Sequence, residues 1–223
     1  MVSVSPVGVG RVPTVLVTGF DPFGGADTNP SWLAVQALHG KRVGGHRIVA
    51  AQLPTVFDRS LQVLDQLLSQ HRPALAICTG QAGGRAALSL ERVAINVNDA
   101  RIADNALAQP VDTPVVGAGP VAYFTSLPIK AMLAALEREG IRAEVSQTAG
   151  TFVCNHVFYG LMHALAIRPA LAGVRGGLIH VPWLPEQGQP SMPLVDIVRG
   201  LKVAIRCALA TSADIRKQAG ALN

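Results

Sequence analysis

The sequence predicts one α/β domain built around a largely parallel central sheet, and three observations support this. The chain has 223 residues, a length that favours one large domain over two small ones. Short apolar, β-branched runs alternate with longer amphipathic segments along the chain, the order of elements typical of parallel α/β folds. Its 49% hydrophobic and 15% charged residues exclude a disordered chain and supply the apolar surface of a full core.

The expected strands are short runs of apolar and β-branched residues. They lie at 14–20, 47–53, 74–80, 89–97, 143–147 and 176–181. The run at 74–80 is apolar almost throughout, as in a parallel strand that is covered on both faces.

The first two expected helices carry signals at their N-termini. Asn29 can cap a helix that begins at Pro30, because proline suits the first helical position. Thr55 and Asp58 resemble a capping box, and the helix after them carries leucines at helical spacing. These are Leu61, Leu64, Leu67 and Leu68.

The second half of the chain continues the alternation after a long connection. Residues 99–119 are rich in Pro, Gly, Asp and Asn, which predicts an ordered loop whose length points to a function. A helix is expected at 127–139, ended by Gly140, and another begins near Phe152. The last helix carries Leu194, Ile197, Leu201 and Ile205 at helical spacing.

Charge and polarity exclude several classes of partner. The net charge is +5, but the basic residues are scattered singly and only 4% of residues are aromatic, so no nucleic-acid partner is expected. Residues 145–167 carry no charged side chain, but polar residues and Gly150 interrupt them, so no membrane helix is expected. The low charge fraction favours a surface covered by a second copy of the chain.

Cysteine usage and the N-terminus bear on where the protein works. Cys78, Cys154 and Cys207 form no C-x-x-C pair, which fits reduced thiols in the cytoplasm. Residues 1–12 have no basic region ahead of their apolar residues and therefore do not resemble a signal peptide. We expect a flexible extension over 1–12 and a single domain over 13–223.

The segment TAGTFVCNH at 148–156 is the sharpest local feature. A strand ends, a turn of small residues follows, and Cys154 falls in the first turn of a helix. Free N–H groups and the positive end of the helix dipole favour a thiolate there and can stabilise an oxyanion. The alternative is a buried cysteine that packs as a small apolar residue, and this is the preferred interpretation of Cys78 and Cys207.

A nucleophilic cysteine needs a base and a group that orients the base. His180 lies near the end of an apolar strand, where open α/β sheets place their sites; the alternative is a satisfied core histidine. Glu91 is a carboxylate among β-branched residues, and orienting an imidazole would satisfy it. Its alternative is a solvated carboxylate at a sheet edge.

A zinc hydrolase that uses Cys154, His156 and His180 is a second interpretation, although this ligand spacing is weak. His156 would point away from Cys154 on a helix, so it is not favoured as the base. No metal or organic cofactor is expected.

Two glycine-rich stretches, 19–25 and 80–85, lack the spacing of phosphate-binding loops. Phe20 and Phe23 follow a strand end in the first of them. Exposed aromatic rings at this place suit the wall of an apolar pocket, with core packing as the alternative.

Taken together, the motifs resemble the pyroglutamyl peptidase I (pyrrolidone-carboxylate peptidase) family, cysteine peptidase family C15. They occur in the family's order and span about residues 14 to 205. They are GFDPFGG…NPSW (19–32), QLP (52–54), GQAGGR…ERVAINVNDARIADN (80–105), QPVD (109–112), AYFTSLPIKAM (122–132), TAGTFVCNH (148–156) and HVPWLPEQ…PSM (180–192).

The resemblance implies a cysteine exopeptidase that hydrolyses the bond after an N-terminal pyroglutamyl residue of peptides. Carried over motif by motif, the nucleophile is Cys154, the base is His180 and the orienting carboxylate is Glu91. It also implies a three-layer fold of the phosphorylase/hydrolase type, with helices on both faces of a twisted sheet, and a homotetramer. The alternative is a degenerate relative that acts on a different amide.

The resemblance also implies a substrate pocket. Phe20, Phe23 and Phe152 would wall the pyrrolidone ring, Gln81 would form a hydrogen bond within the site, and Arg101 would assist the oxyanion. The chain departs from the family pattern at an extended N-terminus, at Gln147 and at Trp183, and the last is expected to narrow the side of the leaving peptide.

Overall fold

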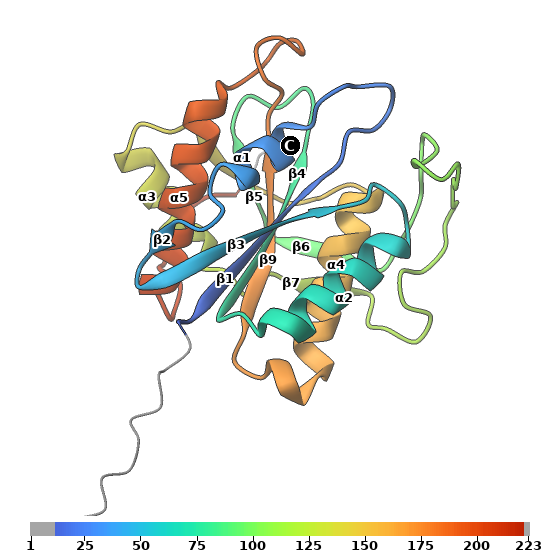
Figure 1. Cartoon of the computed structure of the whole chain (residues 1–223), viewed down its shortest axis with the longest axis horizontal. Helices are drawn as coiled ribbons and strands as arrows, with labels where there is room; N and C mark the ends of the chain where they lie inside the picture. Colours follow the sequence, from blue (N-terminus) through green and yellow to red (C-terminus); the bar gives the residue numbers. More distant parts are fainter. Residues whose placement is uncertain (1–11, 221–223) are drawn as a thin grey trace, which may run out of the picture.

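A seven-stranded sheet separates the helices into two layers (Figure 1). The computed structural model describes residues 12–220, so most of the predicted flexible segment 1–12 lies outside the described residues. The strands are β1 (Thr14–Phe20), β2 (Arg42–Val43), β3 (His46–Leu53), β4 (Leu75–Gln81), β5 (Leu88–Glu91), β8 (Ala143–Ser146) and β9 (Arg175–Val181). Their order across the sheet is β2-β3-β1-β4-β9-β5-β8.

Each face of the sheet has its own apolar core. One face packs against α1 (Pro30–Gln36), α3 (Ile129–Arg138) and α5 (Leu194–Ala210), and the other against α2 (Arg59–His71) and α4 (Val153–Ile167). Neighbouring strand residues such as Val15 and Leu16 belong to different cores, because successive side chains of a strand point to opposite faces. The predicted three-layer α/β fold is thereby confirmed.

Strand direction confirms a mostly parallel sheet and adds one feature that matters for the site. Strands β3, β1, β4 and β9 are mutually parallel. Strand β5 runs antiparallel to β9, with Ser89 opposite His180, and β8 runs parallel to β5. The C-terminal end of β5 therefore lies beside the middle of β9, and not at the edge of the sheet where the parallel strands have their carboxyl ends.

The predicted strand at 89–97 is wrong in its extent, because the chain leaves the main sheet after Glu91. Strand β6 (Val93–Ile95) pairs instead with β7 (Ala122–Phe124), which the sequence analysis did not identify, in a separate two-stranded sheet. Asn155 of α4 holds β6 by accepting a hydrogen bond from the Ile95 N–H at 3.0 Å and donating to the Ile95 carbonyl at 2.9 Å. Asn155 thereby anchors β6 to α4, away from the main sheet.

The predicted capping box is also wrong, whereas the other helix signals are confirmed. The backbone N–H and the hydroxyl of Thr55 both donate to Asp21, so Thr55 is unavailable to cap α2. Asp58 precedes α2 with a φ of 48° and makes no side-chain cap. By contrast, Asn29 accepts a hydrogen bond from the Ser31 N–H at 3.0 Å.

The connection between β6 and β7 is an ordered loop, as predicted for 99–119. Asp104 is 3% exposed, and its carboxylate accepts hydrogen bonds from the backbone N–H groups of Phe57, Ala106 and Ala108. The loop is thereby attached to the start of the α2 region. Among residues 12–220, no helix has the length and apolar character to cross a bilayer.

Candidate active site

The nucleophile candidate is presented by the start of α4. The chain leaves β8, passes through a turn in which Gly150 adopts a φ of 75°, and enters the helix at Val153. Phe152 precedes the helix with extended backbone and no side-chain cap. Cys154 consequently lies in the first helical turn, where N–H groups remain available to an acceptor. The predicted helix start is confirmed.

The side chains of Cys154 and His180 meet above the backbone of Gly80. Gly80 and His180 are register partners on the parallel strands β4 and β9. A Cβ atom built at Gly80 would lie 2.7 Å from Cys154 Sγ and 3.3 Å from His180 Nε2. Only a glycine leaves room for the thiol and the imidazole at this place.

Glu91 completes the arrangement on the other side of the imidazole. Its Oε1 accepts a hydrogen bond from His180 Nδ1 at 2.7 Å, and the carboxylate is completely buried. Ser89 lies opposite His180 across β5 and β9, and alternation places Glu91 on that same face. Because Nδ1 faces the carboxylate, Nε2 faces the thiol.

The surroundings favour a charged imidazole. Burial lowers the pKa of His180, but hydrogen bonds with Cys154 and Glu91 and the charges of these two groups outweigh it, so that the pKa rises to about 9. Burial raises the pKa of the Cys78 thiol to about 12, so Cys78 stays neutral and packs as a small apolar residue. This outcome agrees with the role expected for Cys78.

An aromatic wall and two amides adjoin the thiol. The Phe152 ring lies 5.9 Å from the Phe23 ring and 5.5 Å, edge-on, from the Phe57 ring, centroid to centroid. Gln187 Nε2 donates to Gln81 Oε1 at 3.3 Å. Sequence reasoning assigned no role to Phe57 or to Gln187, although Gln187 lies within the motif HVPWLPEQ.

A cavity of about 600 Å³ opens beside these groups. Its lining includes Phe23, Gln81, Trp183 and Gln187. Phe20, expected as an exposed pocket wall, is only 2% exposed and packs in the core. Arg101 is exposed and makes no hydrogen bond or ion pair within residues 12–220.

His156 has a structural environment that does not suit a metal ligand. It is 1% exposed; its Nε2 accepts from the Asp58 N–H at 3.1 Å, and its Nδ1 lies 2.9 Å from Asn98 Oδ1. Both ring nitrogens are therefore occupied. Within the described part of the chain, no group of three or more His, Cys, Asp or Glu side chains could hold a metal ion.

A thiol at a helix start, an imidazole beside it and a buried carboxylate bonded to that imidazole define a hydrolase of the cysteine nucleophile class. Residues 13–211 match the model of the pyroglutamyl peptidase family. The chain belongs to this family.

Similar proteins cover nearly the whole chain. A pyrrolidone-carboxylate peptidase of Cupriavidus taiwanensis is 60% identical over 95% of this chain and 100% of its own length, and one of Bacillus cytotoxicus is 54% identical over 91% and 95%. The crystal structure of pyroglutamyl peptidase I from Bacillus amyloliquefaciens is 48% identical, with a TM-score of 0.90 over 93% of this chain and 100% of that one. Pyrrolidone carboxyl peptidase from Thermococcus litoralis is 31% identical, with a TM-score of 0.89 over 92% and 99%.

Proposed function

We propose that the chain is a cysteine exopeptidase that removes an N-terminal pyroglutamyl residue from peptides. The observation that carries this proposal is the placement of Cys154 Sγ and His180 Nε2 together above Gly80, with His180 Nδ1 bonded to the buried Glu91. Gln81, the residue after Gly80, lines the adjoining cavity together with Phe23, Trp183 and Gln187. The curated relatives, named pyrrolidone-carboxylate peptidases, support the same substrate.

The reaction starts from the ion pair in which the proton of Cys154 lies on His180 Nε2, and the thiolate attacks the pyroglutamyl carbonyl carbon. The first-turn N–H groups of α4 stabilise the oxyanion, and Arg101 assists them, the role that the family resemblance implies for it. Collapse of the tetrahedral species breaks the C–N bond, and His180 gives its proton to the leaving amine. Water, deprotonated by His180, then cleaves the thioester and releases pyroglutamate. Glu91 holds the imidazole and stabilises its charged form.

The pocket chemistry accounts for the choice of substrate. Pyroglutamate is an uncharged lactam, so the rings of Phe23, Phe57 and Phe152 can cover its flat faces, while Gln81 offers an amide partner. Phe20 belongs to the same apolar core as Phe57 and Phe152. Loss of the hydrogen bonds to the lactam oxygen would discriminate against proline by up to about 10⁴-fold.

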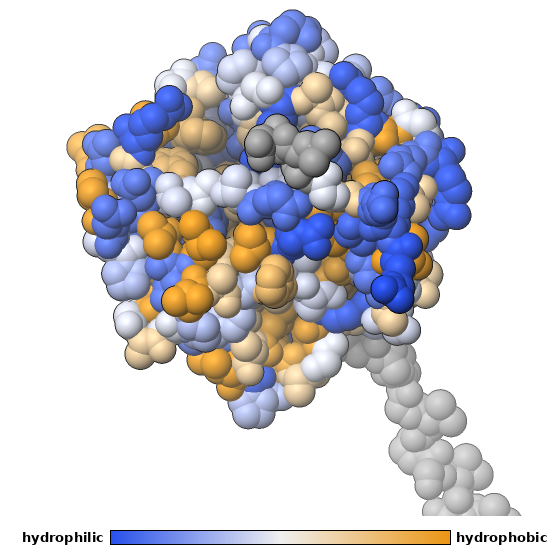
Figure 2. Space-filling model, turned by 180° about the vertical axis from the view of Figure 1, so that it is seen from behind, coloured by the Kyte–Doolittle hydropathy of each residue, from blue (hydrophilic) through white to orange (hydrophobic). Residues whose placement is uncertain are grey.

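We also propose that the enzyme works in the cytoplasm as a homo-oligomer. Cys78, Cys154 and Cys207 are all free thiols, as expected in a reducing compartment. Apolar side chains gather on the face seen in Figure 2. The exposed large apolar residues of the chain include Val121, 89% exposed, and Phe124, 72% exposed. Such residues suit contact with another copy of the chain, for which a tetramer is our specific expectation.

The test is release of a fluorescent amine from a pyroglutamyl amide and from the matching prolyl amide, with reductant present. We expect turnover of the pyroglutamyl compound alone, its loss after iodoacetamide, no effect of a chelator, and no turnover by Cys154→Ala at unchanged thermal stability. A folded wild-type protein that turns over neither compound would instead indicate a relative that acts on a different amide. Inhibition by the chelator would support a metal mechanism.

A further inference from the structure

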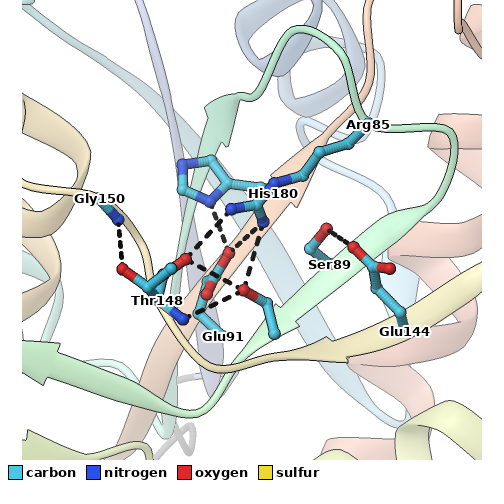
Figure 3. Close-up of polar contacts among 8 residues, drawn as sticks. Arg85, Ser89, Glu91, Glu144, Thr148, Gly150 and His180 are labelled. Carbon is cyan, nitrogen blue, oxygen red and sulfur yellow. Dashed lines mark hydrogen bonds and ion pairs between the residues drawn. The ribbon is translucent and has the colours of Figure 1, made fainter. Parts of the chain in front are cut away.

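Arg85 makes a direct contact with the carboxylate that orients the base (Figure 3). It comes from the loop between β4 and β5. Its Nη1 donates to Glu91 Oε1 at 2.7 Å, the same oxygen that receives His180 Nδ1 at 2.7 Å. The guanidinium and the imidazole therefore share one oxygen atom.

Arg85 also supplies a positive charge to the buried Glu91 carboxylate, which has few other polar partners. Glu91 is fully buried, and its second oxygen, Oε2, has no hydrogen-bond partner among the described residues. When the imidazole is neutral, the guanidinium of Arg85, 27% exposed, is the ion-pair partner left to this carboxylate. A buried carboxylate without a counter-charge is strongly unfavourable.

The same guanidinium binds the turn that leads to the nucleophile. Nη2 donates to the Thr148 carbonyl at 3.1 Å, and Nη1 lies 3.4 Å from Ser146 Oγ. Thr148 Oγ1 in turn accepts from the Gly150 N–H at 3.1 Å, four residues before Cys154. One side chain thus connects the carboxylate of β5 with the entry to α4.

We propose that Arg85 is a positioning residue that holds Glu91 Oε1 toward His180 and fixes the 146–150 turn ahead of Cys154. This inference rests on the proposed function, because it assigns a role in the same reaction. Arg85 acts through Glu91 and the turn, and it needs no contact with substrate.

Removing Arg85 has a consequence for proton binding. When the His180 imidazole loses its proton, the buried Glu91 carboxylate loses one positively charged partner. The Arg85 guanidinium stabilises the carboxylate in that state, so without Arg85 the pair should release its proton at higher pH. The other titratable groups near the pair are Cys154 of α4, the neutral thiol of Cys78 on β4, and Glu144 of β8, which accepts from Ser89 Oγ at 2.7 Å. None of them replaces the positive charge.

The experiment compares Arg85→Met, Arg85→Lys and the control Arg92→Met. Arg92 binds the same turn through Gln147 Oε1 at 2.9 Å but is not bonded to the carboxylate. Two quantities are measured across pH: kcat and KM on the pyroglutamyl amide, and the rate at which iodoacetamide alkylates Cys154, assigned by mass spectrometry. The alkylation rate reports the thiol–imidazole pair whatever the substrate is.

For Arg85→Met we expect kcat to fall on the order of 10²-fold, the effect of a misplacement of about 1 Å, with KM nearly unchanged. The alkaline transition of both profiles should move up by roughly one pH unit. Arg85→Lys should restore the transition but only part of kcat, because an ammonium supplies the charge without the two-pronged geometry. Arg92→Met should behave as wild type.

An unchanged alkaline transition in Arg85→Met would overturn the proposal, as would an equal loss of kcat in Arg92→Met. If the wild type does not cleave the pyroglutamyl amide, the proposed function fails. The alkylation profiles still decide the role of Arg85 in that case.

Discussion

Substitution of Gly80 by alanine tests the central geometry of the site. The added methyl carbon would lie 2.7 Å from Cys154 Sγ, 3.2 Å from His180 Cδ2 and 3.3 Å from His180 Nε2. Non-bonded carbon and heavier atoms prefer about 3.5–4.0 Å, so the thiol must retreat by roughly 1 Å. A displacement of that size costs about 10²-fold in rate.

We therefore expect Gly80→Ala to reduce kcat on the order of 10²-fold while the protein remains folded. Overpacking of this kind costs about 1–3 kcal/mol of stability, which is measured by denaturant unfolding. The matched control is Gly117→Ala, where a Cβ atom meets nothing within 4 Å, and its kcat and stability should match wild type. If Gly80→Ala keeps the wild-type kcat, the thiol and imidazole do not react above Gly80 and the reasoning is refuted.

Three further predictions concern Glu91, His180 and His156. Glu91→Gln should lower kcat by orders of magnitude with little change in KM, because the neutral amide no longer stabilises the imidazolium; steady-state kinetics at pH 7 check this, and a near-native rate would remove Glu91 from the site. The pKa of His180 is raised to about 9 from 6.5, so the stability it contributes is complete below pH 6.5 and is lost as the pH rises through 9; unfolding free energies of His180→Gln should lack this decline. Burial lowers the pKa of His156 to about 4, against the smaller opposing effect of Asp58. The folded state should therefore lose stability as the pH falls from 6.5 toward 4. In His156→Gln, the free energy of unfolding should depend less on pH over this range.

Local signals made the main residues of the site candidates, and the resemblance to the family then assigned their roles. Cys154 follows a turn of small residues at a helix start, His180 ends an apolar strand, and Glu91 interrupts a β-branched run. For the carboxylate, the local sequence indicated only that a buried charge at that position would need a partner, with a solvated carboxylate as the alternative.

Features that depend on tertiary pairing were not predictable from one sequence. Thr55 has the spacing of a helix cap, but Asp21, 34 residues away, takes its hydrogen bonds. Arg85 lies in a glycine-rich loop, where a solvated arginine is the ordinary expectation, and its contact with Glu91 exists only once β5 has paired. Phe57 became part of the aromatic wall because Asp104 and His156 hold the backbone of residues 57 and 58.

The reversed direction of β5 explains why the acid is buried while the thiol is accessible. Ser89 is opposite His180 and Leu90 is opposite Ile179, so the next residue, Glu91, lies two positions deeper along β9 than His180. The carboxylate therefore approaches Nδ1 from inside the protein, and Nε2 is left facing the edge where α4 presents Cys154. A parallel β5 in the same place would carry its next residue toward the open edge, where water would weaken the interaction between carboxylate and imidazole. Burial strengthens the interaction between the Glu91 carboxylate and the His180 imidazole, but a buried carboxylate also needs a second partner. Arg85 is that partner.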